Sequence, residues 1–407
     1  MLCCVDRWNR ASRFPLSIAS GTDTLPSRFQ LLPALMTDQT TKHFYSRLNQ
    51  SNIPALNGIR ALAVVMVILH HLGVSEWELG DLGVIAFFVL SGFLITWLIL
   101  KESERNGNIS IRHFYIRRAL RLLPAFYLFC FAYVGIAMSM RRYDPWDQYL
   151  AALFYFNDYY RWLHPSAHIP LDHTWSLAVE EQFYLLWPWV CVFCKCNRRK
   201  LIHVLLATIV LVAAGRIVYQ VLFSGDHNVV YYSFHTRADS LAIGCLLAVL
   251  FRSGTNYTWL ALLIRHTFAP VVVIVLLVLS VWLETRFGQA YQHTVGLMIW
   301  PILLAILMVQ LIAQSDRPAW NWIDREPLNT MGRWSYAAYL WHWLVDYILV
   351  SRFTTVPLLA KLPLAILLSF GIAALSYYSV ERPFLILRNR FRDNKSVTQS
   401  KETAGLT

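Results

Sequence analysis

Long apolar runs recur along nearly the whole chain, and they restrict its possible folds more than any other feature. Most runs are about 17–25 residues long, the length that an α-helix needs to cross a bilayer, and 238–251 is shorter. Of the 407 residues, 57% are hydrophobic and 15% are charged, whereas soluble domains carry about 25% charged residues. The pattern predicts an all-α, polytopic membrane bundle of about ten spanning helices. The expected spans are 55–73, 82–100, 122–139, 174–194, 201–223, 238–251, 267–283, 295–313, 335–351 and 358–380.

The rest of the chain is predicted to form tails and short connections, without a second domain. Residues 1–50 are expected to be a polar tail, either disordered or beginning upstream of a true start at Met36. Residues 51–388 form the membrane unit, and residues 389–407 form a basic, polar C-terminal tail. The aromatic segment 148–163 is too short for a span, which is typical of an interfacial or re-entrant piece.

Charged loops predict the orientation of the bundle. Basic residues cluster in segments 101–121 and 195–200 and in the tail from Arg388 to Lys395. Such loops face the cytoplasm in membrane proteins, so both termini are expected there, in the inner or plasma membrane of a cell. The acidic loop 74–81 is expected to face outward. This distribution accounts for the net charge of +12 without a nucleic-acid partner.

The first expected span joins an arginine and a histidine on one face. Arg60 and His71 are eleven residues apart, which in an α-helix is three turns plus about 20° and a rise of about 16 Å. Ionisable residues inside a membrane helix are costly and often functional. His71 can therefore be a general base for a hydroxyl acceptor. The alternative is a polar helix end, with Arg60 at the headgroups and His71 at the outer interface.

Arginines also cluster in the segment RRALRLLP, residues 117–124. Arg118 and Arg121 are three residues apart and face the same way on a helix, and Arg117 is adjacent. Arginines at a cytoplasmic membrane surface can hold phosphates through bidentate hydrogen bonds. The alternative is an ordinary anchor that contacts anionic lipids.

Two neighbouring carboxylates lie in the apolar segment HTWSLAVEEQFYLLWP, residues 173–188. Glu180 and Glu181 need partners at such a position. One of them can orient a catalytic histidine or bind an acceptor hydroxyl. The alternative is a structural ion pair with Arg216 or Arg237.

Three weaker signals have mainly structural interpretations. Arg237 and Asp239 are expected to form an internal ion pair. His342, among aromatic residues, is predicted to be a buried, hydrogen-bonded histidine before a catalytic one. Ser91 and Gly92 in the middle of a helix favour close helix packing.

Seven blocks of the sequence, taken together and in order, resemble the acyltransferase family 3 of integral-membrane O-acyltransferases. They lie between residues 53 and 388 and read IPALNGIRALAVVMVILHHLG, LGVIAFFVLSGFLITWLI, FYIRRALRLLPAFY, HTWSLAVEEQFYLLWP, HTRADSLAIGCLLA, MGRWSYAAYLWHW and YYSVERPF. The resemblance implies a ten-helix domain that moves acyl groups, often acetyl from acetyl-CoA, onto sugar hydroxyls outside the cytoplasm. No further domain follows in this sequence, so we expect the membrane domain to act alone or with a separate partner.

The resemblance also implies roles for individual residues. The family's characteristic residues fall on Arg60, His71, Arg118, Arg121 and Glu180. Among the two adjacent histidines the match selects His71 over His70. We therefore expect an acyl-CoA donor whose phosphates lie near Arg117, Arg118 and Arg121. We expect His71, oriented or assisted by Glu180, to deprotonate the acceptor.

Two alternatives stay open at this level. His71 can act only as a base, or it can itself be acylated transiently. Ten spans with buried charges also fit a transporter or flippase for lipid-linked sugars. The expected partners are acyl-CoA, an extracytoplasmic glycan or other hydroxyl acceptor, and membrane lipids. No metal is expected, because no histidine near Cys191, Cys194 and Cys196 completes a zinc site.

Overall fold

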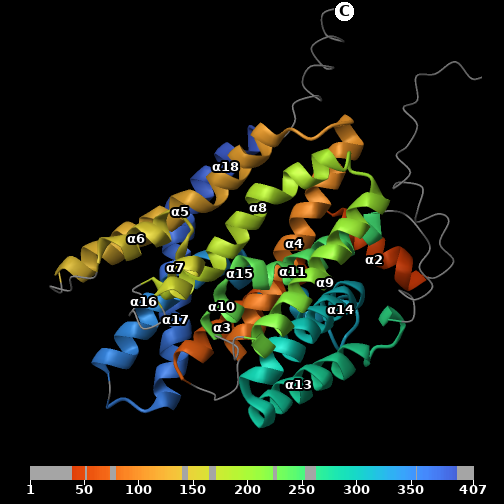
Figure 1. The fold of residues 1–407 in the computed structure, drawn as a ribbon. Coiled ribbons are helices and arrows are strands. Elements are labelled where there is room, and N and C mark those ends of the chain that lie inside the picture. Colours follow the sequence, from red (N-terminus) through yellow and green to blue (C-terminus); the bar gives the residue numbers. More distant parts are fainter. Residues whose placement is uncertain are drawn as a thin grey trace, which may run out of the picture.

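A computed structural model describes residues 39–50, 53–73, 79–139, 145–164, 171–222, 227–252, 263–353 and 355–391, and every regular element in these ranges is helical (Figure 1). A helix corresponds to each expected span. These helices are α3 (Pro54–His71), α4 (Leu79–Asn106), α5 (Ile111–Ser139), α8 (Trp175–Phe193), α9 (Arg198–Leu222), α11 (Phe234–Arg252), α13 (Ala269–Tyr291), α14 (Leu297–Gln314), α16 (Ser335–Arg352) and α17 (Leu358–Ser376).

Seven of the described helical segments are long and apolar enough to cross a membrane. One of them, Ala269–Gln314, has 46 residues and contains both α13 and α14. The chain is therefore a multi-pass membrane protein. The expected count of about ten spans and the cytoplasmic position of the termini stay predictions.

The segment 101–121, expected to be a loop, is mostly helical. Helix α4 continues to Asn106, where Gly107 follows with φ of +75°, a conformation that commonly ends helices. Helix α5 begins at Ile111, well before the expected start at residue 122. The boundary was wrong because the basic residues of this stretch lie at helical spacing among apolar ones, so the helix extends beyond its apolar part.

Several short helices complete the bundle. They are α2 (Gln39–Asn49), α6 (Trp146–Leu153), α7 (Asn157–Leu163), α10 (His227–Tyr232), α15 (Leu328–Arg333) and α18 (Arg382–Asn389), with the 3₁₀ turns η1 (Asp172–Thr174) and η3 (Asn321–Asp324) and the π-helical turns η2 (Gln292–Gly296) and η4 (Tyr377–Glu381). The aromatic segment 148–163 thus forms parts of two short helices, α6 and α7.

Helix α2 lies inside the range expected to be a polar tail. Its Phe44, Tyr45 and Leu48 are buried in a hydrophobic cluster with Trp300 of α14. The tail therefore does not extend to residue 50. Residues 1–38, with the proposed start at Met36, lie outside the described residues, as do residues 392–407.

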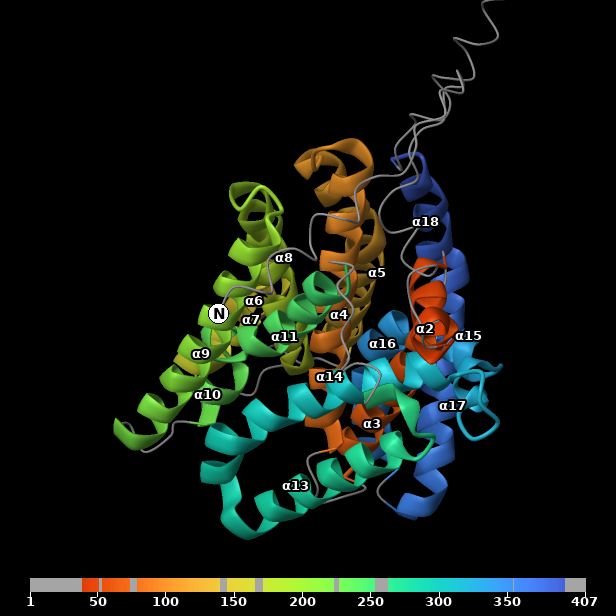
Figure 2. The same cartoon turned by 90° about the vertical axis from the view of Figure 1, so that its right-hand side faces the viewer.

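The basic segments gather at one end of the bundle. In both views the junction of α4 with α5, the junction of α8 with α9, and helix α18 lie at the same end (Figures 1 and 2). This arrangement agrees with their expected common side of the membrane. At the acidic connection 74–81, residues 74–78 lie outside the described residues. Asp81 belongs to α4, where it is buried and accepts a hydrogen bond of 2.7 Å from Gln292.

Glycines bring α4 and α11 into close contact. A Cβ atom at Gly92 would lie 2.0 Å from the carbonyl oxygen of Leu241, and one at Gly244 would lie 2.1 Å from that of Val89. The backbones can approach so closely only because both positions lack a side chain. The prediction of close packing around Gly92 is confirmed.

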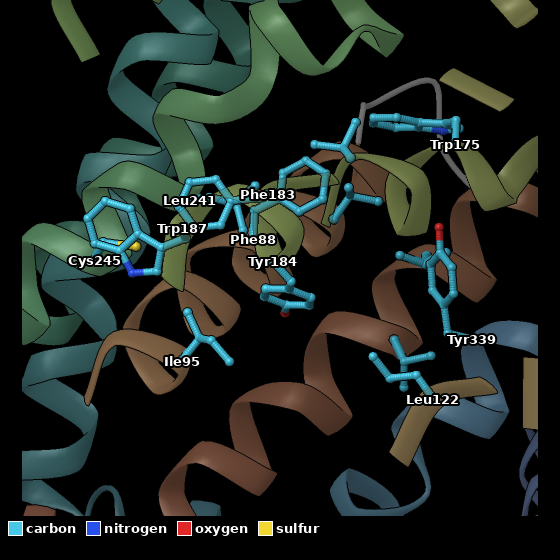
Figure 3. Close-up of a cluster of buried hydrophobic side chains, with 14 of the residues drawn as sticks. Phe88, Ile95, Leu122, Trp175, Phe183, Tyr184, Trp187, Leu241, Cys245 and Tyr339 are labelled. Atoms are coloured by element: carbon cyan, nitrogen blue, oxygen red, sulfur yellow. The ribbon is translucent and has the colours of Figure 1, made fainter. Parts of the chain in front are cut away.

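Buried aromatic and aliphatic side chains fill the space between α4, α8 and α11. Figure 3 shows Phe88, Phe183 and Leu241 grouped in the middle of this cluster, with Trp187 on one side and Trp175 on the other. The cluster fixes how α8 is rotated against α4, and α8 carries Glu180 and Tyr184.

Candidate active site

A cavity of about 620 Å³ opens between α3, α4, α5, α8, α15 and α16. Its volume lies within the roughly 300–1,000 Å³ usual for ligand pockets. Five of the six residues expected to catalyse the transfer or bind the donor line it: Arg60, Arg117, Arg118, Arg121 and Glu180. The sixth, His71, does not belong to its lining.

The arginines of the cavity differ in whether they have a partner. Arg117 forms an ion pair with Glu102 at 2.5 Å and donates a hydrogen bond to the carbonyl of Phe391 at 3.3 Å. Arg118 lies over the ring of Tyr184, 3.9 Å from its centroid.

Among the residues that the structure describes, Arg60, Arg118 and Arg121 have no ion pair. Three guanidinium groups thus face one hollow without a carboxylate bonded to them. Such a cluster suits an anionic ligand with several phosphate oxygens.

Glu180 lies among these arginines, but hydroxyl groups hold it. Ser91 donates a hydrogen bond to its Oε1 at 2.9 Å, and Tyr184 donates one to its Oε2 at 3.4 Å. In the described part of the chain no hydrogen bond joins Glu180 to His71. Neither does Glu180 pair with Arg216. The structure therefore places this carboxylate with the cavity and apart from the histidine.

His71 contacts a second group of side chains, which we call the histidine cluster: His71, His173, His342 and Asp346. The Nδ1 atom of His71 lies 2.9 Å from the carbonyl oxygen of Val67 and 3.3 Å from Nε2 of His342. The ring centroids of His173 and His342 are 5.5 Å apart. His71 is partly exposed, whereas the other three members are buried.

Tyr339 lies at the boundary between the cavity and the histidine cluster. It lines the cavity, and its ring centroid is 5.4 Å from that of His342. Its hydroxyl donates to the carbonyl of His173 at 2.8 Å and lies 2.5 Å from Oγ of Ser176, which also lines the cavity. Tyr184 and Tyr339 therefore mark two places along the cavity wall, from α8 and α16 (Figure 3).

Sequence reasoning missed part of this cluster. His342 was considered, but its contact with His71 joins residues that are 271 positions apart and leaves no local pattern. Asp346 had a usable signal, since an acid four residues after a histidine shares its face on a helix. One ligand atom each from His71, His342 and Asp346 lies within 4.8 Å of the others, so these residues are also the ones to test for a metal.

The expected ion pair between Arg237 and Asp239 is wrong. Asp239 instead pairs with Arg216 of α9 at 2.6 Å, and Arg216 also donates to the carbonyl of Thr236 at 2.6 Å. Arg237 lies within 6 Å of three aromatic rings, with its guanidinium 5.0 Å from the ring centroid of Tyr231. Residues two apart on a helix point to different sides. Arg237 and Asp239 therefore contact side chains of different neighbouring helices and not each other.

Comparisons with known proteins identify relatives of the whole membrane unit. The profile of the family described as "Acyltransferase domain", acyltransferase family 3, matches residues 53–378. The chain is 31% identical over 350 residues to "Putative peptidoglycan O-acetyltransferase YrhL" of Bacillus subtilis (strain 168), covering 81% of this chain and 54% of that protein.

Two further relatives have similar names. The chain is 32% identical over 374 residues to "Peptidoglycan O-acetyltransferase OatA" of Listeria monocytogenes, covering 85% of this chain and 57% of that protein. It is 31% identical over 366 residues to "Putative O-acetyltransferase SACOL0978" of Staphylococcus aureus (strain COL), covering 84% of this chain and 59% of that protein.

The chain thus spans little more than half the length of these three relatives. No solved structure matches it. The profile match over most of the chain favours the acyltransferase interpretation over the transporter alternative, and the chain belongs to the acyltransferase family 3.

Proposed function

We propose that this protein is a membrane O-acetyltransferase that moves an acetyl group from acyl-CoA to a hydroxyl of a cell-wall glycan. The observation that carries the proposal is the cavity with three unpaired arginines, which ends beside a group containing His71. The arginines of the cavity suit a polyanionic donor, and His71 suits the role of a base.

The charge of the cavity supports the choice of donor. Arg60, Arg118 and Arg121 offer guanidinium groups that can form bidentate bonds with phosphates, and CoA carries several phosphate oxygens. The basic segments at one end of the bundle support entry from the cytoplasm, where acyl-CoA is made. The thioester is expected at the end of the cavity near Ser176 and Tyr339.

In the proposed transfer step, His71 accepts a proton from the acceptor hydroxyl. The acceptor hydroxyl oxygen attacks the thioester carbonyl carbon while Nε2 of His71 takes the hydroxyl proton. The tetrahedral intermediate collapses with cleavage of the C–S bond. The departing CoA thiolate then takes the proton from His71, which returns to its neutral form. A two-step route, in which Nε2 first carries the acetyl group, uses the same nitrogen.

The acceptor is proposed from the relatives' names, two of which specify peptidoglycan. A glycan hydroxyl outside the cytoplasm agrees with the partial exposure of His71 and with its place outside the donor cavity. We propose that the protein works in the cell membrane, with the donor on one side and the acceptor on the other.

The test is transfer of radiolabelled acetyl from acetyl-CoA to cell-wall glycan by membranes that contain the full chain. His71→Ala is expected to lower the rate by about 10²–10⁴-fold, the usual contribution of general acid–base catalysis. The adjacent His70→Ala is the matched control and is expected to keep most of the rate.

Full transfer by His71→Ala would contradict the assignment of the base. Equal use of a small acetyl thioester without phosphates would contradict the assignment of the donor. Acetyl-histidine trapped at residue 71 would select the two-step route.

A further inference from the structure

The histidine cluster contains enough hydrogen-bond acceptors to determine which nitrogen of each ring carries a proton. The Nδ1 atom of His342 lies 2.5 Å from the carbonyl oxygen of Tyr339. A carbonyl oxygen can only accept, so this nitrogen carries the hydrogen. A neutral imidazole has one N–H and one lone pair, and the lone pair of His342 is therefore on Nε2.

The same reasoning applies to His71. Its Nδ1 lies 2.9 Å from the carbonyl oxygen of Val67, so this nitrogen also carries the hydrogen. The lone pair on Nε2 of His342 lies 3.3 Å from that same Nδ1. The two acceptors share one N–H, and Nε2 of His71 is left as the unprotonated nitrogen.

We propose that His342 is a positioning residue that holds His71 in the Nδ1–H tautomer, with Nε2 as the reactive nitrogen. The inference deepens the proposed function and rests on it for the role of Nε2. When His71 takes a proton, its Nδ1–H becomes a stronger donor, and the bond to His342 strengthens with the positive charge. A partner that fixes the ring and its tautomer is a general requirement for a catalytic histidine.

Asp346 lies next to this arrangement. It follows His342 by one helical turn and is buried, and neither of its carboxylate oxygens has a hydrogen-bond partner. Its oxygen lies within 4.8 Å of ring nitrogens of both His71 and His342. When it is ionised, a carboxylate at this distance favours a positive charge on His71.

A metal ion is the competing explanation for the same cluster. Two histidines and a carboxylate are common metal ligands. The Nδ1–H of His71 leaves its Nε2 as a possible metal ligand. The lone pair on Nε2 of His342, however, faces the Nδ1–H of His71 and is therefore not available to a metal in this arrangement. The test therefore includes a measurement of bound metal per chain, and a bound metal ion would favour the competing explanation.

The test compares two replacements of His342. His342→Leu removes the acceptor, and His342→Gln keeps an acceptor oxygen near the position of Nε2. We expect His342→Leu to lower kcat by about 10²-fold or more, with KM for acetyl-CoA changed by less than about threefold. His342→Gln is expected to recover kcat to within about tenfold of the unmodified protein. The buried His293, which contacts Gln220 away from the cluster, supplies the control His293→Leu.

A second measurement does not depend on activity. Nitrogen-15 spectra of the purified, histidine-labelled protein report the tautomer of His71, identified by its loss in His71→Ala. The Nδ1–H form is expected in the unmodified protein and in His342→Gln, and a mixture of forms is expected in His342→Leu.

Several results would overturn the inference. They are an unchanged kcat in His342→Leu, an equal loss in His342→Gln, an Nε2–H tautomer of His71, and one bound metal ion per chain that disappears in His342→Leu. If the tautomer is as expected but acetyl-CoA is no donor, the proposed function fails and the positioning of His71 by His342 stands.

Discussion

Two sets of arginines in the bundle differ in how they are paired, and we interpret one set as structural charge and the other as binding charge. Between α9 and α11, Arg216 is fully buried and bonds to Asp239 at 2.6 Å and to two backbone carbonyls. Around the cavity, Arg118 and Arg121 have no ion pair in the described residues, although Glu180 lines the same space.

The difference follows from what each arginine faces. Arg216 is surrounded by packed helices, where burial of a charge without a partner costs several kcal/mol. Arg237, which is also buried but has no ion pair in the described residues, lies instead among aromatic rings. A charge that faces an open cavity can keep water until a ligand replaces it. We therefore interpret the unpaired arginines at the cavity as binding residues and the paired Arg216 as a structural one.

The largest effect that tests this contrast is expected at the buried pair. Arg216→Met leaves Asp239 buried without its partner, which costs about 3–5 kcal/mol. Thermal unfolding of the purified protein in detergent measures the loss. The double variant Arg216→Met with Asp239→Leu is expected to recover much of the stability. Unchanged unfolding of the single variant, or a large rise of KM for acetyl-CoA in folded protein, would break the contrast.

A smaller effect, on binding rather than stability, is expected at the cavity. Arg118→Gln or Arg121→Gln removes a charged donor, which is worth about 1.5–3 kcal/mol, and should raise KM for acetyl-CoA roughly 10- to 100-fold. Initial rates over a range of acetyl-CoA concentrations give this value.

Arg117→Gln is the matched control for these two variants. Arg117 already pairs with Glu102, so its removal should raise KM for acetyl-CoA by less than about threefold. Equal effects at Arg117, Arg118 and Arg121 would show that pairing in the structure does not distinguish binding arginines.

A smaller effect, opposite in sign to that at Arg118 and Arg121, is expected at Glu180. Glu180→Gln keeps an oxygen for Ser91 but removes a negative charge from the phosphate site, so KM for acetyl-CoA should fall, by about threefold for a partly solvated charge. The same kinetic series measures kcat, which is expected to change little. A 10²-fold fall of kcat at unchanged KM would instead support the sequence-based role of Glu180 as an assistant of His71.

The sequence alone predicted the helical composition of the bundle and five of the residues that line the candidate cavity. Apolar runs specify membrane helices locally, so a helix corresponds to each expected span. The errors are mainly in helix boundaries at polar ends, such as the start of α5 at Ile111. Spacing along one helix also placed Arg118 and Arg121 on one face, because the helical repeat is fixed.

Only the tertiary structure decided which side chains meet across helices. In the structure His71 contacts His342, and Glu180 bonds to Ser91 and not to His71. Asp239 pairs with Arg216 and not with Arg237. These pairings depend on how each helix is rotated and how closely it packs, as at the glycine contact of α4 with α11. Residues far apart in sequence set that packing, so no local spacing reveals it.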